Sequence, residues 1–145
     1  MTTAFSSIVA AVIATLNAAP AVCEVVYRAR VAPVPETTQL AVNVQFEGST
    51  PQHGAIRGAP IDWQSRISVE CYAKAFDDNG DIAVDALLQA VYERIAADTT
   101  LAGLVDDIQP VALDAENSAE GMKTGWVKLS YIAIHRTTNA SLEAE

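Results

Sequence analysis

Apolar and polar positions alternate along several stretches of the chain, as a half-buried strand requires. The clearest stretch is residues 66–73, which places Ile67, Val69, Cys71 and Ala73 on one face. The same alternation predicts further strands over residues 23–31, 39–46, 108–115 and 124–135. Pro110 interrupts the fourth of these five strands, so that strand is expected at a sheet edge or a bulge.

Two other stretches have the helical spacing of about 3.6 residues. In residues 82–97 a single apolar stripe is formed by Val84, Leu87, Leu88, Val91 and Ile95. In residues 4–18 the stripe consists of Phe5, Ile8, Val9, Val12, Ile13 and Leu16. Thr2 or Thr3 can cap the first helix and Pro20 ends it, while Asp81 is the expected N-cap of the second.

These elements follow one another in the order α-β-β-β-α-β-β, which predicts an α+β fold over residues 1–136. Strands in meander-like runs pair antiparallel, so we expect a mostly antiparallel sheet with both helices packed on one face. Residues 47–60 are rich in glycine and proline and predict a long loop. Residues 137–145 are polar and acidic and are expected to form a flexible tail without a partner.

The sheet face without helices is expected to remain open. Polar residues predicted there are Arg28, Arg30, Gln39, Asn43, Gln45, Arg66, Glu70 and Lys128. Apolar residues mixed with them are Val26, Tyr72, Ile132 and Ile134. Such a mixture suits water or a polar partner, and makes a contact surface plausible.

The 145 residues suit one domain, and their formal charge of -9 opposes binding to the phosphate backbone of nucleic acids. The apolar run of residues 8–16 is too short to span a bilayer. A signal peptide requires a positively charged residue before its apolar run, but no Lys or Arg precedes Arg28. We therefore expect no membrane association. Cys23 and Cys71 are predicted to be buried free thiols, with a disulfide between them as the alternative.

The chemistry expected of an enzyme is absent from the sequence. With only His53 and His135, both predicted at the surface, no credible triad or metal-ligand spacing exists. Residues 54–58 resemble a phosphate loop but lack the lysine and hydroxyl residue that should follow. Residues 77–81 resemble a calcium loop but lack its closing glutamate. The sequence thus predicts no catalytic residues, no cofactor and no metal.

Residues 98–105, Asp-Thr-Thr-Leu-Ala-Gly-Leu-Val, lie between the second helix and the next predicted strand. This segment is similar to the post-helix segment of the tail terminator proteins of long-tailed bacteriophages, and the element order resembles that family over nearly the whole chain. The resemblance implies a homo-hexameric ring that caps the tail tube protein, stops tube growth and meets the head connector or another neck protein. DNA would pass through the lumen without specific binding. The protein would be assembled in the host cytoplasm and reside in the virion.

A ring requires contacts between different surfaces of neighbouring subunits. The residues expected to contribute are Arg28, Arg30, His53, Arg57, Trp63 and Arg66. For Trp63 and Arg66, ordinary packing on their own sheet is the alternative. Two other functions remain open: another neck or tail-completion protein, and a ligand-binding or enzymatic module on a ferredoxin-like sheet, which would need a pocket with convergent polar groups.

Overall fold

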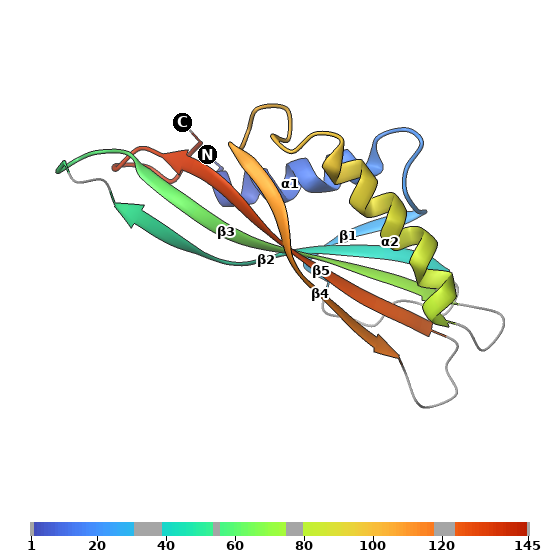
Figure 1. The fold of residues 1–145 in the computed structure, drawn as a ribbon. Helices are drawn as coiled ribbons and strands as arrows, with labels where there is room; N and C mark the ends of the chain where they lie inside the picture. Colours follow the sequence, from blue (N-terminus) through green and yellow to red (C-terminus); the bar gives the residue numbers. More distant parts are fainter. Residues whose placement is uncertain (1, 31–38, 54–55, 75–79, 118–123, 145) are drawn as a thin grey trace.

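The computed structural model describes residues 2–30, 39–53, 56–74, 80–117 and 124–144. It has the predicted α+β fold, a five-stranded sheet with two helices packed on one face (Figure 1). The elements are α1 (Ala4–Asn17), β1 (Val25–Arg28), β2 (Leu40–His53), β3 (Ile61–Lys74), α2 (Gly80–Ala96), β4 (Asp107–Asn117) and β5 (Thr124–Thr137). The order of elements confirms the prediction, although several bounds differ.

The strands lie in the order β1-β2-β3-β5-β4, with β3 in the centre. All neighbours pair antiparallel except β1, which runs parallel to β2. The expectation of a meander at this end of the sheet is therefore wrong. β1 ends at Arg28 and β2 begins at Leu40, so the two strands are not joined by a short hairpin turn, which would have imposed an antiparallel pair.

The two faces of β1 are also the reverse of the prediction. Val26 is aligned with Val42 of β2 and packs against the core on the helix side, although we expected it on the open face. Arg28 lies on the helix side too, where it bonds Ser6 of α1. Three consecutive residues of β1 are apolar or aromatic, so their alternation did not define a face.

The loop predicted over residues 47–60 is much shorter, because β2 continues to His53 and β3 begins at Ile61. A register shift between Phe46 and Gly48 lets β2 continue into the glycine- and proline-rich stretch, whose composition is unfavourable for a strand. β1 pairs with β2 only as far as Val44, so beyond that point β2 is an edge, where a proline removes no bond to a further strand. The resulting β2–β3 hairpin projects from the sheet, away from α2 (Figure 1).

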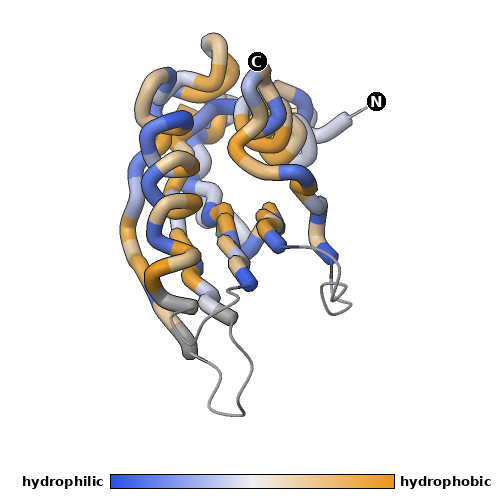
Figure 2. Tube along the Cα trace, turned by 90° about the vertical axis from the view of Figure 1, so that its right-hand side faces the viewer, coloured by the Kyte–Doolittle hydropathy of each residue, from blue (hydrophilic) through white to orange (hydrophobic). Residues whose placement is uncertain are grey.

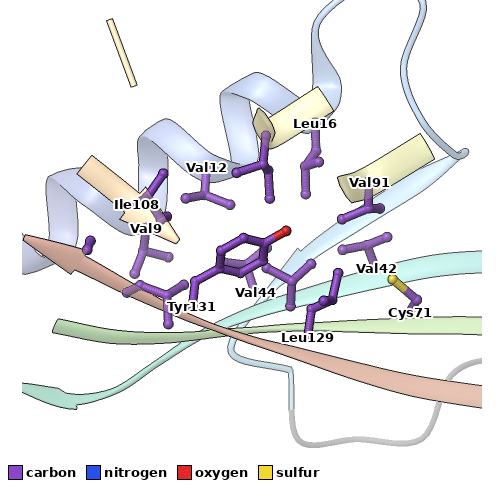
Figure 3. Packing of buried hydrophobic residues seen from close by; sticks show 14 of the residues in the cluster. Val9, Val12, Leu16, Val42, Val44, Cys71, Val91, Ile108, Leu129 and Tyr131 are labelled. Carbon is purple, nitrogen blue, oxygen red and sulfur yellow. The ribbon is translucent and has the colours of Figure 1, made fainter. Parts of the chain in front are cut away.

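The core lies between the helices and the sheet (Figure 3). As predicted, β3 contributes Ile67, Val69, Cys71 and Ala73, and α2 contributes Val84, Leu87, Val91 and Ile95. Hydrophobic residues recur at intervals among hydrophilic ones along α2 (Figure 2). From α1 come Ile8, Val9, Val12 and Leu16, and from β5 come Val127, Leu129, Tyr131 and Ala133.

β4 is an edge strand with a register shift between Pro110 and Ala112, which confirms both parts of that prediction. α2 begins at Gly80, so Asp81 lies inside the helix and the prediction of Asp81 as its N-cap is wrong. Residues 118–121 of the predicted polar turn lie outside the described residues. Within the described part of the chain, no helix is both long and apolar enough to cross a membrane.

The C-terminal segment, expected to have no partner, makes two backbone contacts. Thr137 forms a β-bridge with Ala144, and the N–H of Ala4 donates to the carbonyl of Leu142 over 2.6 Å. The second bond satisfies one of the free N–H groups at the start of α1. The segment thus packs beside the beginning of the first helix (Figure 1).

Candidate functional site

The residues predicted to make subunit contacts lie in separate regions of the molecule. Arg28 is on the helix side of β1, where its Nη2 donates to the hydroxyl of Ser6 over 2.7 Å. Arg30, just after β1, stacks on Tyr27 with its Cζ 4.5 Å from the ring centroid. Both cations are thus engaged within their own subunit.

Trp63 and Arg66 lie on opposite faces of β3. Trp63 packs edge-on against Phe5 of α1 at 5.1 Å between ring centroids, and its Nε1 donates to Thr137 over 2.9 Å. Arg66 is on the open face, where its Nη1 donates to the hydroxyl of Thr50 over 3.3 Å. Trp63 therefore has the intramolecular packing role that we weighed against an interface, while the guanidinium of Arg66 is exposed.

His53 and Arg57 come together at the end of the β2–β3 hairpin. With Ile56, Gly58 and Ala59 they line a cavity of about 250 Å³, which Asn139 of the C-terminal segment also lines. We call these five hairpin residues the hairpin tip. Ile56 is 78% exposed. Arg57 is exposed and makes no hydrogen bond or ion pair with any described residue. His53 is exposed as predicted, although it ends a strand rather than lying in a loop.

A second surface, which the sequence did not indicate, lies between α2 and β4. It is a groove of about 440 Å³ whose lining is mostly apolar: Asp85, Leu88, Gln89, Tyr92, Pro110, Val111, Ala112, Leu113 and Leu129. Val111 is 55% exposed and Leu113 57% exposed. The only indication of this surface in the sequence was the pair of large apolar residues, Val111 and Leu113, on a strand predicted at the sheet edge. We call this surface the α2–β4 groove.

The open sheet face carries a polar network beside exposed apolar residues such as Ile134. Glu47 accepts a hydrogen bond from Ser68 at 2.8 Å and pairs with Lys128 at 3.4 Å. The bond from Ser68, and then the charge of Lys128, lower the pKa of the Glu47 carboxyl. Asn43 donates to Glu70 at 3.2 Å on the same face. These side chains satisfy one another and suit contact with water or a polar surface.

His135 is buried, which contradicts its predicted place at the surface. It is 2% exposed, and its Nε2 lies 2.6 Å from the hydroxyl of Ser65, which in turn lies 2.9 Å from that of Ser49. Phe5 covers the imidazole edge-on. The sequence did not reveal this cluster because its members come from three strands.

The geometry of the His135 cluster argues for a structural role. Burial lowers the pKa of the imidazole, which favours the neutral ring, while the charge of Asp106 acts in the opposite direction. Ser65 is fully buried, so its hydroxyl is closed to a substrate. The distance alone resembles a nucleophile and its base, but the access that nucleophilic catalysis requires is missing at this serine.

The thiols and acids give no indication of a reactive centre. Cys71 is buried and Cys23 half-buried, and both are free, so the prediction of buried free thiols is right for Cys71 and partly right for Cys23. Burial raises the pKa of the Cys71 thiol to about 12, which disfavours the nucleophilic thiolate. Among the described residues, no group of three or more His, Cys, Asp or Glu is placed to hold a metal ion.

The segment after α2 is a compact turn organised by Asp98. One carboxylate oxygen accepts from the N–H and the hydroxyl of Thr100, and the other accepts from the N–H of Ala102 at 2.8 Å. These bonds lower the pKa of Asp98, that of the Thr100 hydroxyl being the strongest cause. They hold Leu101 and Ala102 at positive φ, so that the Leu101 side chain is buried.

Neither protein-family models nor curated proteins give a match to this chain. The chain has two exposed surfaces at different places on the fold, an open sheet face with a polar network, and an acidic overall charge.

Proposed function

We propose that this chain is a structural protein of a bacteriophage virion, a tail terminator that forms a hexameric ring. The ring would cap the tail tube, stop its growth and join the tail to the head connector or another neck protein. The observation that carries the proposal is the succession α-β-β-β-α-β-β, with both helices on one sheet face and a compact turn at residues 98–105 after the second helix. The element order and the sequence of residues 98–105 are the two features on which the resemblance to that family rests.

Ring formation needs two different surfaces on each subunit, because a cyclic contact is heterologous. The hairpin tip and the α2–β4 groove are two such surfaces; the tip exposes Ile56, and the groove exposes Val111 and Leu113. Exposed apolar groups that gather at one place are typical of contact sites. This pair of surfaces supports an assembling subunit.

The charge of the chain suits a conduit for DNA. A net charge of -9 repels the phosphate backbone, so a lumen lined by this protein would let DNA pass without binding it. The open face, with its internally satisfied polar groups, is compatible with a wet surface of that kind.

The proposal is tested by measuring the mass of the purified protein over a concentration series by light scattering, followed by electron microscopy of any oligomer. We expect a closed ring, either free or on the ends of purified tail tubes. Tubes whose ends are already capped serve as the control and should bind no further protein. A chain that stays monomeric at high concentration and ignores uncapped tube ends would refute the proposal.

Two alternatives have their own discriminating results. Binding to head portals rather than to tube ends would indicate a different neck or tail-completion protein. The α2–β4 groove is the observation that favours a ligand-binding module, since its volume lies within the range of small-molecule sites. A selective rise in melting temperature with one compound class in a ligand screen, abolished by Leu113→Asp, would support that function.

A further inference from the structure

The α2–β4 groove exposes apolar surface that α2 and β4 leave uncovered. Its lining includes Tyr92, which is 43% exposed, and the still more exposed Val111 and Leu113. Strand addition at this edge is hindered, because Pro110 has no N–H to donate and the register shift beside it bends the strand. An occupant would therefore be recognised through side chains that fill the groove rather than by extending the sheet.

The rim of the groove carries one unpaired acid. Asp85 is exposed and makes no hydrogen bond or ion pair with any of the residues described. Gln89, the next polar lining residue, donates to Glu93 over 2.6 Å, which places a second carboxylate close by. The groove thus offers an apolar floor with negative charge at its border, and a fitting occupant has an exposed apolar side chain next to a cation.

The hairpin tip has that chemistry. Ile56 has the highest exposed fraction among the large apolar residues that the structure describes, and Arg57 beside it is a cation without a partner among them. The tip lies at one end of the sheet and α2 covers the other, so a subunit's tip does not reach its own groove (Figure 1). Only a second copy of the chain can bring the two surfaces together.

We infer that the hairpin tip of one subunit seats in the α2–β4 groove of the next, with Ile56 on the apolar floor and Arg57 against Asp85. The inference rests on the proposed ring and names its repeating contact. Subunits of net charge -9 repel one another, and a local pairing of opposite charges offsets this at the contact. Because the two surfaces differ, the contact is heterologous and repeats from subunit to subunit until the ring closes.

A charge exchange tests the pairing. Arg57→Asp and Asp85→Arg should each weaken self-association by about tenfold or more, as loss of a desolvated interface pair does, and the two changes combined in one chain should restore most of it. The measurement is sedimentation equilibrium or light scattering, with circular dichroism to confirm that each variant folds. If neither single change alters association, or the double variant fails to recover, the pairing of Arg57 with Asp85 is wrong.

The apolar half of the contact has its own test and a matched control. Ile56→Asp should prevent assembly, whereas Ile134→Asp, at a 39% exposed isoleucine on the open sheet face, should leave it intact. If rings form with Ile56→Asp but not with Ile134→Asp, the inferred contact is wrong and the open sheet face makes the contact instead. The proposed ring itself would still stand. A wild-type chain that makes no ring in solution or on tubes would overturn both.

A cross-linking measurement reports on the contact even when it is short-lived. Mixing Ile56→Cys protein with Leu113→Cys protein under mild oxidation should yield a covalent heterodimer. The control mixture pairs Ile134→Cys with Leu113→Cys and should yield none above background. Equal yields in the two mixtures would contradict the proposed seating of the tip.

Discussion

Removing the phenolic hydroxyl of Tyr131 tests the packing of the core, because this core substitution is expected to raise stability rather than lower it. The side chain is 2% exposed at the centre of the core, and its hydroxyl has no hydrogen-bond partner among the described residues (Figure 3). Burial also raises the pKa of this tyrosine. A buried polar group without a partner costs about 1–3 kcal/mol, so Tyr131→Phe should stabilise the protein even though most core substitutions destabilise.

The expected size follows from this penalty. Tyr131→Phe removes the hydroxyl and keeps the ring, so the free energy of unfolding should rise by about 1 kcal/mol after the loss of a few dispersion contacts. An unfolding entropy of about 2.1 cal/mol/K per residue gives roughly 0.3 kcal/mol/K for this chain, and hence a melting temperature about 3 °C higher.

Urea unfolding followed by tryptophan fluorescence, with the slope m unchanged, measures the difference directly. Tyr92→Phe is the matched control, because it removes the same atom from an exposed ring and should change stability little. A loss of stability on Tyr131→Phe would refute the reasoning and show that the hydroxyl has a partner. A cavity of about 30 Å³ lined by Tyr131 is large enough to hold a water in that role.

Two further predictions concern the sheet. Because burial lowers the folded-state pKa of His135 below 6.5, the unfolded chain binds more protons as pH falls, so stability should be constant above about pH 6.5 and decline below it. His135→Gln should flatten that decline in pH-dependent urea titrations; a slope that survives His135→Gln would assign it to another group. Gly48→Ala, at φ 128°, should cost about 1–3 kcal/mol in thermal unfolding, mainly through backbone strain, because the guanidinium of Arg66 that would lie 2.6 Å from the new methyl can swing away. Full rescue by Arg66→Ala would show instead that the steric contact dominates.

The predictable part of the fold was the part determined by local periodicity. The stripe of Val84, Leu87, Val91 and Ile95 and the alternation in β3 each define one face without reference to any other segment, and both were buried as expected. The edge position of β4 followed from the single residue Pro110.

The wrong predictions share a cause, because each of these structural features depends on a partner that is distant in sequence. Gly48 and Pro51 indicate a loop when viewed alone, yet cross-strand pairing with β3 and an unpaired outer edge keep them in a strand. His135 is buried because Ser65 and Phe5 meet it from other elements. In β1, three consecutive residues are apolar or aromatic, so alternation does not define the face.

The candidate site was only partly predictable for the same reason. His53 was predicted at the surface and Arg57 as a contact residue of the same glycine- and proline-rich region, and they do lie together at the hairpin tip. The α2–β4 groove was missed because it exists only where a helix and a later strand come together. In the sequence, the apolar residues of the groove cannot be distinguished from ordinary helix and strand residues, because the sequence does not show which elements are neighbours in space.

The central position of β3 has a consequence for the order in which the chain folds. β2 with β3, and β4 with β5, are two hairpins of neighbouring segments, whereas β3 and β5 join residues as far apart as Ile61 and Thr137. Closing such long loops is slow, so docking of the two hairpins is expected to follow their formation. The hairpin tip belongs to the first unit, but the α2–β4 groove arises only when α2 packs across β3 and β5 and β4 lies beside it. A nascent chain would therefore form its tip early and complete its groove last, so that, in the proposed ring, only a fully folded subunit could receive a neighbour.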